Sequence, residues 1–211
     1  MDRITELTIN TYNNIAQQYT RDFFYNEDGI KFVNKFIEYI KGNKVLDVGC
    51  GSGGLTKEFI KHNYDITGID LSEKMIEIAK QKVPNVKFEI QDIRKTNFEC
   101  GAFNALLVYR SLIHIKSEEI QKTLKEFYRL LKNDGVIGIV ARVSDKPFEQ
   151  MEKEVYNPNL NIFFKYFSEK EMQEELIKSS FSIEYSIVEE VKVADSREAI
   201  KEVRIIARKG V

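Results

Sequence analysis

The 211-residue chain has little cysteine, proline and histidine, and it has no tryptophan. Its two cysteines, Cys50 and Cys100, cannot build a disulfide framework, and they lack the paired spacing of a zinc site. We therefore expect no metal site, and a reducing compartment fits this cysteine usage best. The three prolines fall outside the strongly periodic segments, and no repeat or linker divides the chain. Residues 1–211 are expected to form a single domain.

Long apolar runs and an excess of one charge are also absent. Residues 1–14 are too polar for a signal peptide, and no apolar run approaches the ~18 residues that a membrane span needs. The chain has 32 Lys and Arg against 33 Asp and Glu, without a block of like charges. Such a balance disfavours nucleic acid as a partner. We expect a cytoplasmic protein with no membrane or nucleic-acid partner, and the oligomeric state stays open.

Short segments rich in Val and Ile alternate with longer amphipathic stretches, which is typical of a parallel sheet with crossover helices. The expected strands are residues 44–48, 65–69, 86–90, 105–109, 136–141, 181–193 and 203–208. Residues 194–202 are too short for a parallel crossover, so the last two strands should form an antiparallel hairpin at the sheet edge. The sequence thus predicts an α/β three-layer sandwich with a mostly parallel seven-stranded sheet.

Serines mark the expected helix starts. Ser72, Ser117 and Ser168 each precede an amphipathic stretch, and Glu171 gives Ser168 the spacing of a capping box. The Asn-Asp-Gly run at residues 133–135 should stop the helix that Ser117 begins.

The aromatic-rich segment at residues 144–167 fits neither a helical nor a strand pattern. We interpret it as an inserted cover. Core packing and the shaping of a small, partly apolar ligand pocket explain its aromatic residues equally well.

A glycine-rich turn follows the first expected strand, in the sequence DVGCGSGG, and a helix follows the turn. Glycines let the backbone turn sharply and approach a ligand, while the helix N-terminus presents unpaired N–H groups. The second strand ends at Asp70, about twenty residues later, where a carboxylate can accept hydrogen bonds from ribose hydroxyls. A turn without a ligand and an acid that favours the next helix dipole are the plainer alternatives. Together, the two signals predict a nucleoside-bearing ligand.

The nature of that ligand depends on Asp47. Gly49, Gly51 and Gly54 formally satisfy the G-x-G-x-x-G spacing of a dinucleotide site, so a nicotinamide cofactor is one alternative. Asp47 lies two residues before Gly49, where its negative charge would repel a pyrophosphate and attract an amine or a sulfonium. A positively charged ligand is therefore favoured.

These residues resemble the class I S-adenosylmethionine (SAM)-dependent methyltransferases. VLDVGCGSG is similar to their first motif, DITGIDLSEKMIEIAK to the second-strand element, FEIQDI to the third-strand acid motif and FNALLVYRSLIHI to the fourth-strand motif. The resemblance covers roughly residues 10–208 and implies the Rossmann-like methyltransferase fold, with SAM as the cofactor.

The resemblance also implies roles for single residues. Gly49, Gly51 and Gly53 would pack against the adenosyl and methionine portions, Asp70 would hold the ribose, and Asp92 with Ile93 would contact the adenine. The chemistry of these side chains agrees, because Asp92 can accept a hydrogen bond from an exocyclic amine and Leu71 offers an apolar surface to a ring. A solvated loop acid is the alternative for Asp92.

Methyl transfer needs a general base only where the acceptor carries a proton, and the chain has two histidines. His62 ends a helix and is expected to be solvated. His114 follows the fourth strand in YRSLIHI and is the candidate catalytic base, although a packed histidine bonded to a backbone group is the alternative. Tyr109 and Arg110 occupy the strand tip and should border the methyl group or the acceptor; Arg110 could clamp an anion or be a solvated charge.

The N-terminal segment places Tyr12, Ile15, Ala16, Tyr19 and Phe23 on one helical face. Similar segments in small-molecule methyltransferases fold over the cofactor, so Tyr12 and Tyr19 are cofactor-binding candidates in a helical lid at about residues 5–25. An ordinary amphipathic helix packed on the sheet is the alternative.

The sequence therefore predicts an enzyme that transfers a methyl group from SAM to a small-molecule acceptor by in-line displacement. Two alternatives stay open: a SAM-binding protein without turnover and a nicotinamide-dependent Rossmann oxidoreductase. The acceptor and the methylated atom are not determined by the sequence.

Overall fold

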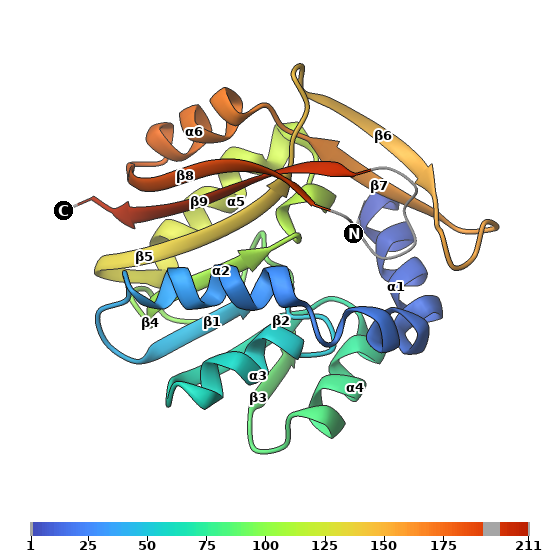
Figure 1. The fold of residues 1–211 in the computed structure, drawn as a ribbon, viewed down its shortest axis with the longest axis horizontal. Coiled ribbons are helices and arrows are strands. Elements are labelled where there is room, and N and C mark those ends of the chain that lie inside the picture. Colours follow the sequence, from blue (N-terminus) through green and yellow to red (C-terminus); the bar gives the residue numbers. More distant parts are fainter. Residues whose placement is uncertain (1, 192–198, 211) are drawn as a thin grey trace.

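The computed structural model describes residues 2–191 and 199–210. Its main sheet has seven strands in the order β3-β2-β1-β4-β5-β9-β8. These strands are β1 (Lys44–Val48), β2 (Asp65–Asp70), β3 (Lys87–Ile90), β4 (Phe103–Tyr109), β5 (Leu131–Arg142), β8 (Phe181–Val191) and β9 (Ile200–Lys209). β1 to β5 pair in parallel, whereas β9 runs antiparallel to both β5 and β8. The predicted mostly parallel sheet with an antiparallel edge pair is confirmed (Figure 1).

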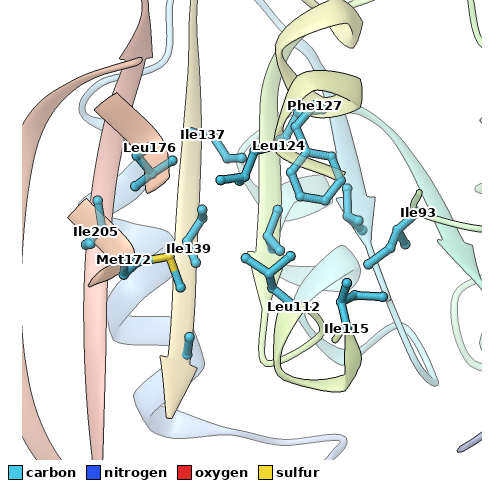
Figure 2. Packing of buried hydrophobic residues seen from close by; sticks show 14 of the residues in the cluster. Ile93, Leu112, Ile115, Leu124, Phe127, Ile137, Ile139, Met172, Leu176 and Ile205 are labelled. Atoms are coloured by element: carbon cyan, nitrogen blue, oxygen red, sulfur yellow. The ribbon is translucent and has the colours of Figure 1, made fainter. Parts of the chain in front are cut away.

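Helices cover both faces of this sheet because consecutive strand residues point to opposite sides. The helices are α1 (Arg3–Phe23), α2 (Glu27–Ile37), α3 (Gly54–Lys61), α4 (Glu73–Lys82), α5 (Ser117–Leu130) and α6 (Glu169–Lys178), with a 3₁₀ turn η1 (Leu112–His114). α2 and α3 pack on one face against residues such as Val45 and Leu107, and α5 and α6 pack on the other against residues such as Leu46 and Leu106. Figure 2 shows this second layer, in which Leu124 and Met172 face β5. The result is a three-layer sandwich.

The aromatic segment at residues 144–167 contains a β-hairpin that the sequence analysis did not anticipate. β6 (Phe148–Lys153) pairs antiparallel with β7 (Asn161–Tyr166) in a separate two-stranded sheet. β6 is exposed at five of its six positions, so it has no apolar face to produce a strand pattern. The hairpin lies beside α1, at one end of the main sheet (Figure 1).

Two of the three predicted serine caps are confirmed. The Ser72 hydroxyl accepts from Met75 N, and the Ser168 hydroxyl accepts from Glu171 N. The prediction for Ser117 is wrong: Ser117 is already the first residue of α5, and Lys116 occupies the cap position without a side-chain hydrogen bond. A serine before acidic residues can occupy either position, so the pattern alone is ambiguous.

Some predicted boundaries also shift. The helix α5 ends at Leu130, before residues 133–135, because Leu131 already pairs with Phe103 as the first residue of β5. The expected extension of the penultimate strand to Val193, and most of its connection to the last strand, lie outside the described residues.

Within residues 2–191 and 199–210, no helix has the length and apolar character required to cross a membrane. The same residues contain no group of three or more His, Cys, Asp or Glu side chains placed to hold a metal ion.

Candidate active site

Three adjoining cavities lie at the carboxyl ends of the central parallel strands, where open α/β sheets bind ligands. The Asp70 cavity is lined by the ends of β1, β2 and β4 together with α1. The Asp47 cavity lies beside it and reaches the start of α3. The hairpin cavity, of about 420 Å³, lies between α1 and the β6–β7 hairpin. Tyr19 lines all three, and Tyr12 and Arg110 line both the Asp70 and hairpin cavities.

The glycine turn after β1 folds tightly against the neighbouring strands. The N–H groups of Gly49 and Cys50 donate to Ile69 O at 2.8 and 2.9 Å. Gly49 has φ +74°, and a Cβ built there would lie 2.3 Å from the Cβ of Ser111. Gly51 has φ +52°, and a Cβ there would meet only open space, next to both the Asp70 and the Asp47 cavities. Gly49 is thus required by protein packing, whereas Gly51 leaves room for a ligand.

Replacing Gly49 by alanine is expected to lower the free energy of unfolding by about 2–5 kcal/mol, because the left-handed backbone and the clash with Ser111 both cost energy. Urea unfolding followed by circular dichroism measures the loss. Gly101→Ala is the matched control. Gly101 has φ +67°, but a Cβ built there would lie 3.9 Å from its nearest neighbour, Lys132 Cα, so only the backbone strain of about 1–2 kcal/mol applies. Equal losses in the two variants would contradict the clash with Ser111.

Asp70 closes β2 and is held by backbone N–H groups from two segments. Gly51 N donates to Oδ2 at 3.0 Å and Ser72 N donates to Oδ1 at 2.8 Å. Burial raises the pKa of Asp70, and these hydrogen bonds oppose the rise. The carboxylate lines the Asp70 cavity with both oxygens oriented, as recognition of two adjacent hydroxyls requires.

Asp47 lies at the end of β1 and is almost completely buried, with 2% of its surface exposed. The Thr56 hydroxyl donates to its Oδ2 at 2.6 Å. Burial raises the pKa of Asp47 to about 7, and the nearby charge of Asp70 adds to the rise. Within residues 2–191 and 199–210 no Lys, Arg or His is bonded to Asp47, so its buried carboxyl is suited to a cationic ligand, which would favour the ionised form.

The helix α1 lies across the ends of the strands and covers the Asp70 and hairpin cavities. Ser72 donates its hydroxyl hydrogen to Asn13 Oδ1 at 2.7 Å, and the Thr11 hydroxyl donates to Asn161 O of β7 at 2.9 Å. Tyr12 and Tyr19 of this helix line both cavities and pack edge to face, with ring centroids 5.6 Å apart. The two tyrosines of the expected lid therefore stand between the Asp70 cavity and the hairpin cavity.

His114 is engaged on both ring nitrogens. Its Nδ1 lies 2.8 Å from Phe163 O, and its Nε2 lies 2.9 Å from the Tyr12 hydroxyl. Burial lowers the pKa of His114 to about 4, so the imidazole is neutral at pH 7. His114 is therefore a packed histidine bonded to a backbone carbonyl, which was the alternative to a catalytic base. Its second partner, Tyr12, lines the Asp70 and hairpin cavities. His62 is partly exposed and lies near Glu58, at 3.8 Å.

The tip of β4 supplies Tyr109 and Arg110. The Tyr109 hydroxyl accepts from Asn26 Nδ2 at 3.3 Å and lines the Asp47 cavity. Arg110 forms a two-point ion pair with the buried Glu202, at 2.5 and 3.0 Å. The alternative that Arg110 is a solvated charge is wrong, because β9 brings Glu202 from 92 residues away to face it.

The remaining predicted site residues divide into two groups. Leu71 and Ile93 line the Asp70 cavity. Asp92 accepts from the guanidinium of Arg94 with both oxygens, and Gly53 is the N-cap residue of α3. Neither is among the residues that line the three cavities.

Several cavity residues had no signal in the sequence. Arg142, at the end of β5, stacks over Phe164 with its guanidinium carbon 3.8 Å from the ring centroid, and donates to the Tyr166 hydroxyl. Glu154 is a buried acid near the tip of the hairpin. These residues meet only because the hairpin folds against α1, so spacing along the chain could not have identified them. Asn26 caps α2, and a cap pattern before that helix could have found it.

The sheet order, the glycine turn and the paired acids define an adenosyl-binding protein with the methyltransferase type of Rossmann-like fold. Comparisons with known proteins support this class. Residues 45–135 match a family model described as a methyltransferase domain. The chain is 31% identical over 187 residues to a demethylmenaquinone methyltransferase of Staphylococcus aureus, covering 81% of this chain and 76% of that protein. The chain therefore belongs to the SAM-dependent methyltransferases, and the nicotinamide alternative is not favoured.

Other similar proteins cover less of the sequence or share only the fold. A ubiquinone biosynthesis O-methyltransferase of Coxiella burnetii is 33% identical over 110 residues, which are 50% of this chain and 46% of that protein. The chain thus aligns with about half the length of that relative. The structure of a Burkholderia thailandensis 1,6-didemethyltoxoflavin-N1-methyltransferase superposes with a TM-score of 0.75 at 19% identity, covering 100% of this chain and 92% of that one.

Proposed function

We propose that this protein transfers a methyl group from SAM to a small, partly apolar acceptor that binds in the hairpin cavity. The observation that carries the proposal is the continuity of the cavities: Tyr12, Tyr19 and Arg110 line both the Asp70 cavity and the hairpin cavity. A donor in the first and an acceptor in the second would meet at these residues, as an in-line displacement requires. The names of the relatives, which refer to a quinone and to a toxoflavin precursor, also describe small-molecule acceptors.

The residues of the Asp70 and Asp47 cavities fit the cofactor. In our proposal Asp70 binds the ribose hydroxyls, Leu71 and Ile93 contact the adenine, and Asp47 attracts the positive charge of the methionine portion. Gly51 leaves the open space that the cofactor needs beside the turn. The bound cofactor supplies an electrophilic methyl group that is already activated by its sulfonium charge.

The two segments above the strands complete the proposed arrangement. The helix at about residues 5–25 would act as a lid over the cofactor, and the segment at about residues 144–167 would cover the acceptor. Aromatic residues from both segments, including Tyr19 and Phe164, line the hairpin cavity and would exclude water from the reaction.

Incubation of the protein with methyl-labelled SAM and a metabolite extract tests this function. We expect label to appear in a small-molecule product, identified by mass spectrometry, and to be strongly reduced at subsaturating SAM when the Asp70→Asn variant is used. Tight SAM binding without any labelled product would instead identify a SAM-binding protein without turnover.

A further inference from the structure

The hydrogen bond between Tyr12 and His114 joins a residue that lines both the Asp70 and the hairpin cavities to one that lines the Asp70 cavity. The two atoms involved, the Tyr12 hydroxyl oxygen and His114 Nε2, are 2.9 Å apart, and the two rings meet edge to face. Tyr12 lines both cavities. The pair therefore stands where a donor in one cavity and an acceptor in the other would meet.

The direction of this hydrogen bond follows from the other side of the imidazole. Phe163 O can only accept a hydrogen bond, so the Nδ1 that faces it at 2.8 Å carries the ring proton. Because burial holds the pKa of His114 near 4, the imidazole carries a single proton at pH 7, and Nε2 is an acceptor. Tyr12 must therefore donate its hydroxyl hydrogen to Nε2.

The Tyr12 oxygen is consequently a hydrogen-bond acceptor toward the cavities. The hydroxyl hydrogen is donated to His114, so the oxygen can only accept a hydrogen bond from a ligand, through its lone pairs. Burial raises the pKa of Tyr12 well above its usual value; the charges of Glu154 and Asp70 add to the rise, and that of Arg142 opposes it. The hydroxyl thus stays protonated at neutral pH.

We propose that the reacting atom of the methyl acceptor is an oxygen or nitrogen that still carries a proton, and that Tyr12 is the catalytic residue that receives this proton while passing its own to His114. The proposal rests on the proposed function and specifies the acceptor class of the same site. It excludes thioethers and tertiary amines, which have no proton to give to the Tyr12 oxygen.

The protons and electrons balance in this step. As the acceptor lone pair forms the new bond to the methyl carbon, the bond from that carbon to sulfur breaks and its electron pair stays on sulfur. The acceptor proton moves to the Tyr12 oxygen, and the Tyr12 proton moves to His114 Nε2, giving an imidazolium. The total charge of the site is unchanged, because the sulfonium charge disappears as the imidazolium charge appears.

A histidine with a pKa of about 4 is a weak base. It is strong enough for this step because the proton is transferred only once the bond to the methyl group is forming. The proton on a neutral hydroxyl is only weakly acidic, but it becomes strongly acidic as the oxygen acquires a methyl group and a positive charge. The proton can therefore move during or after bond formation. His114 acts through Tyr12 and is a positioning residue, since both of its nitrogens are already engaged.

Nitrogen NMR of histidine-labelled protein tests the direction of the hydrogen bond. The chain has only two histidines, so His62→Gln assigns both imidazoles. In the wild type, His114 should show a protonated Nδ1 and a hydrogen-bonded, unprotonated Nε2 at pH 7. In Tyr12→Phe the Nε2 resonance should shift by several ppm while Nδ1 stays protonated. A protonated Nε2 in the wild type would overturn the proposal.

Binding of phenol and methoxybenzene tests the acceptor class, because these probes differ in the hydroxyl proton. Calorimetry is performed with each protein saturated by S-adenosylhomocysteine, the demethylated cofactor. We expect phenol to bind the wild type about fivefold more tightly than methoxybenzene, as one hydrogen bond provides. The preference should vanish in Tyr12→Phe and persist in Tyr19→Phe, which removes a hydroxyl from the same cavities.

Equal affinities for the two probes in the wild type, including no binding of either, would overturn the inference, as would a preference that survives in Tyr12→Phe. Failure of the protein to bind S-adenosylhomocysteine would instead contradict the proposed function. The two failures are therefore distinguishable in one set of titrations.

Discussion

Replacement of Asp70 by asparagine is expected to weaken SAM binding by about 100-fold, the largest effect of any single change at the cofactor site. Hydrogen bonds to a charged acceptor each contribute roughly 1.5–3 kcal/mol, and in the proposed site the carboxylate accepts from both ribose hydroxyls. Asparagine keeps the shape but loses the charge and one acceptor. It also presents an amide N–H₂ group toward either Gly51 N or Ser72 N, both of which donate to Asp70. Calorimetric titration with SAM measures the loss.

The control for this prediction is Asp65→Asn. Asp65 lies at the opposite end of the same strand and is exposed, so the same substitution there should leave SAM affinity within about twofold. Comparable SAM affinities for wild type and Asp70→Asn would remove Asp70 from the ribose-binding role.

The affinity for SAM is also expected to decrease as the pH is lowered, because Asp47 becomes protonated. In the free protein its pKa is about 7, so the carboxyl is mostly ionised at pH 8 and mostly protonated at pH 6. A cationic ligand favours the ionised form and lowers this pKa, so binding releases a proton from Asp47 and becomes weaker as the pH falls. Between pH 8 and pH 6 the ionised fraction in the free protein decreases about tenfold.

The matched variant for this experiment is Asp47→Asn, which removes the titrating group and keeps a hydrogen-bond acceptor for Thr56. Since the amine of SAM titrates in the same range, the informative quantity is the ratio of wild-type affinity to variant affinity at each pH. This ratio should fall about tenfold from pH 8 to pH 6. A ratio that is independent of pH would show that the Asp47 charge does not face the ligand.

The central part of the site was predictable because its residues are close in sequence and lie at strand ends. Asp47 lies in the last part of β1, the turn at Gly49 to Gly53 follows directly, and Asp70 closes the adjacent parallel strand. Two neighbouring parallel strands end at the same edge of the sheet, so a short stretch of sequence determines their relative placement. The hydrogen bond from Gly51 N to Asp70 is the direct result of that arrangement.

The hairpin cavity was not predictable in the same way. The hairpin cavity combines α1 with residues more than 130 positions later, such as Phe164 and Tyr166. β6 is exposed, so its sequence has neither a helical nor an alternating pattern. Likewise, the pairing of Arg110 with Glu202 depends on the antiparallel register of β9 against β5, which no local motif encodes.

His114 illustrates the limit of residue type as a guide to role. Its position after β4 made it the candidate base, and its chemistry is that of a base. The fold, however, places Phe163 O on one nitrogen and the Tyr12 hydroxyl on the other. In our proposal Tyr12, which lies on α1 and is 102 positions away, is therefore the group that reaches the acceptor.

By itself, the sequence determined the parallel sheet, the glycine turn, the carboxylates at the ends of β1 and β2, and hence the kind of cofactor, because these features depend on local spacing and on the edge that parallel strands share. The tertiary structure decided what each buried group touches: the carbonyl and the hydroxyl that bond to His114, the acid that pairs with Arg110, and the aromatic residues that line the hairpin cavity. Those contacts arise between segments distant in sequence, and their geometry is set by how α1 and the hairpin pack on the sheet.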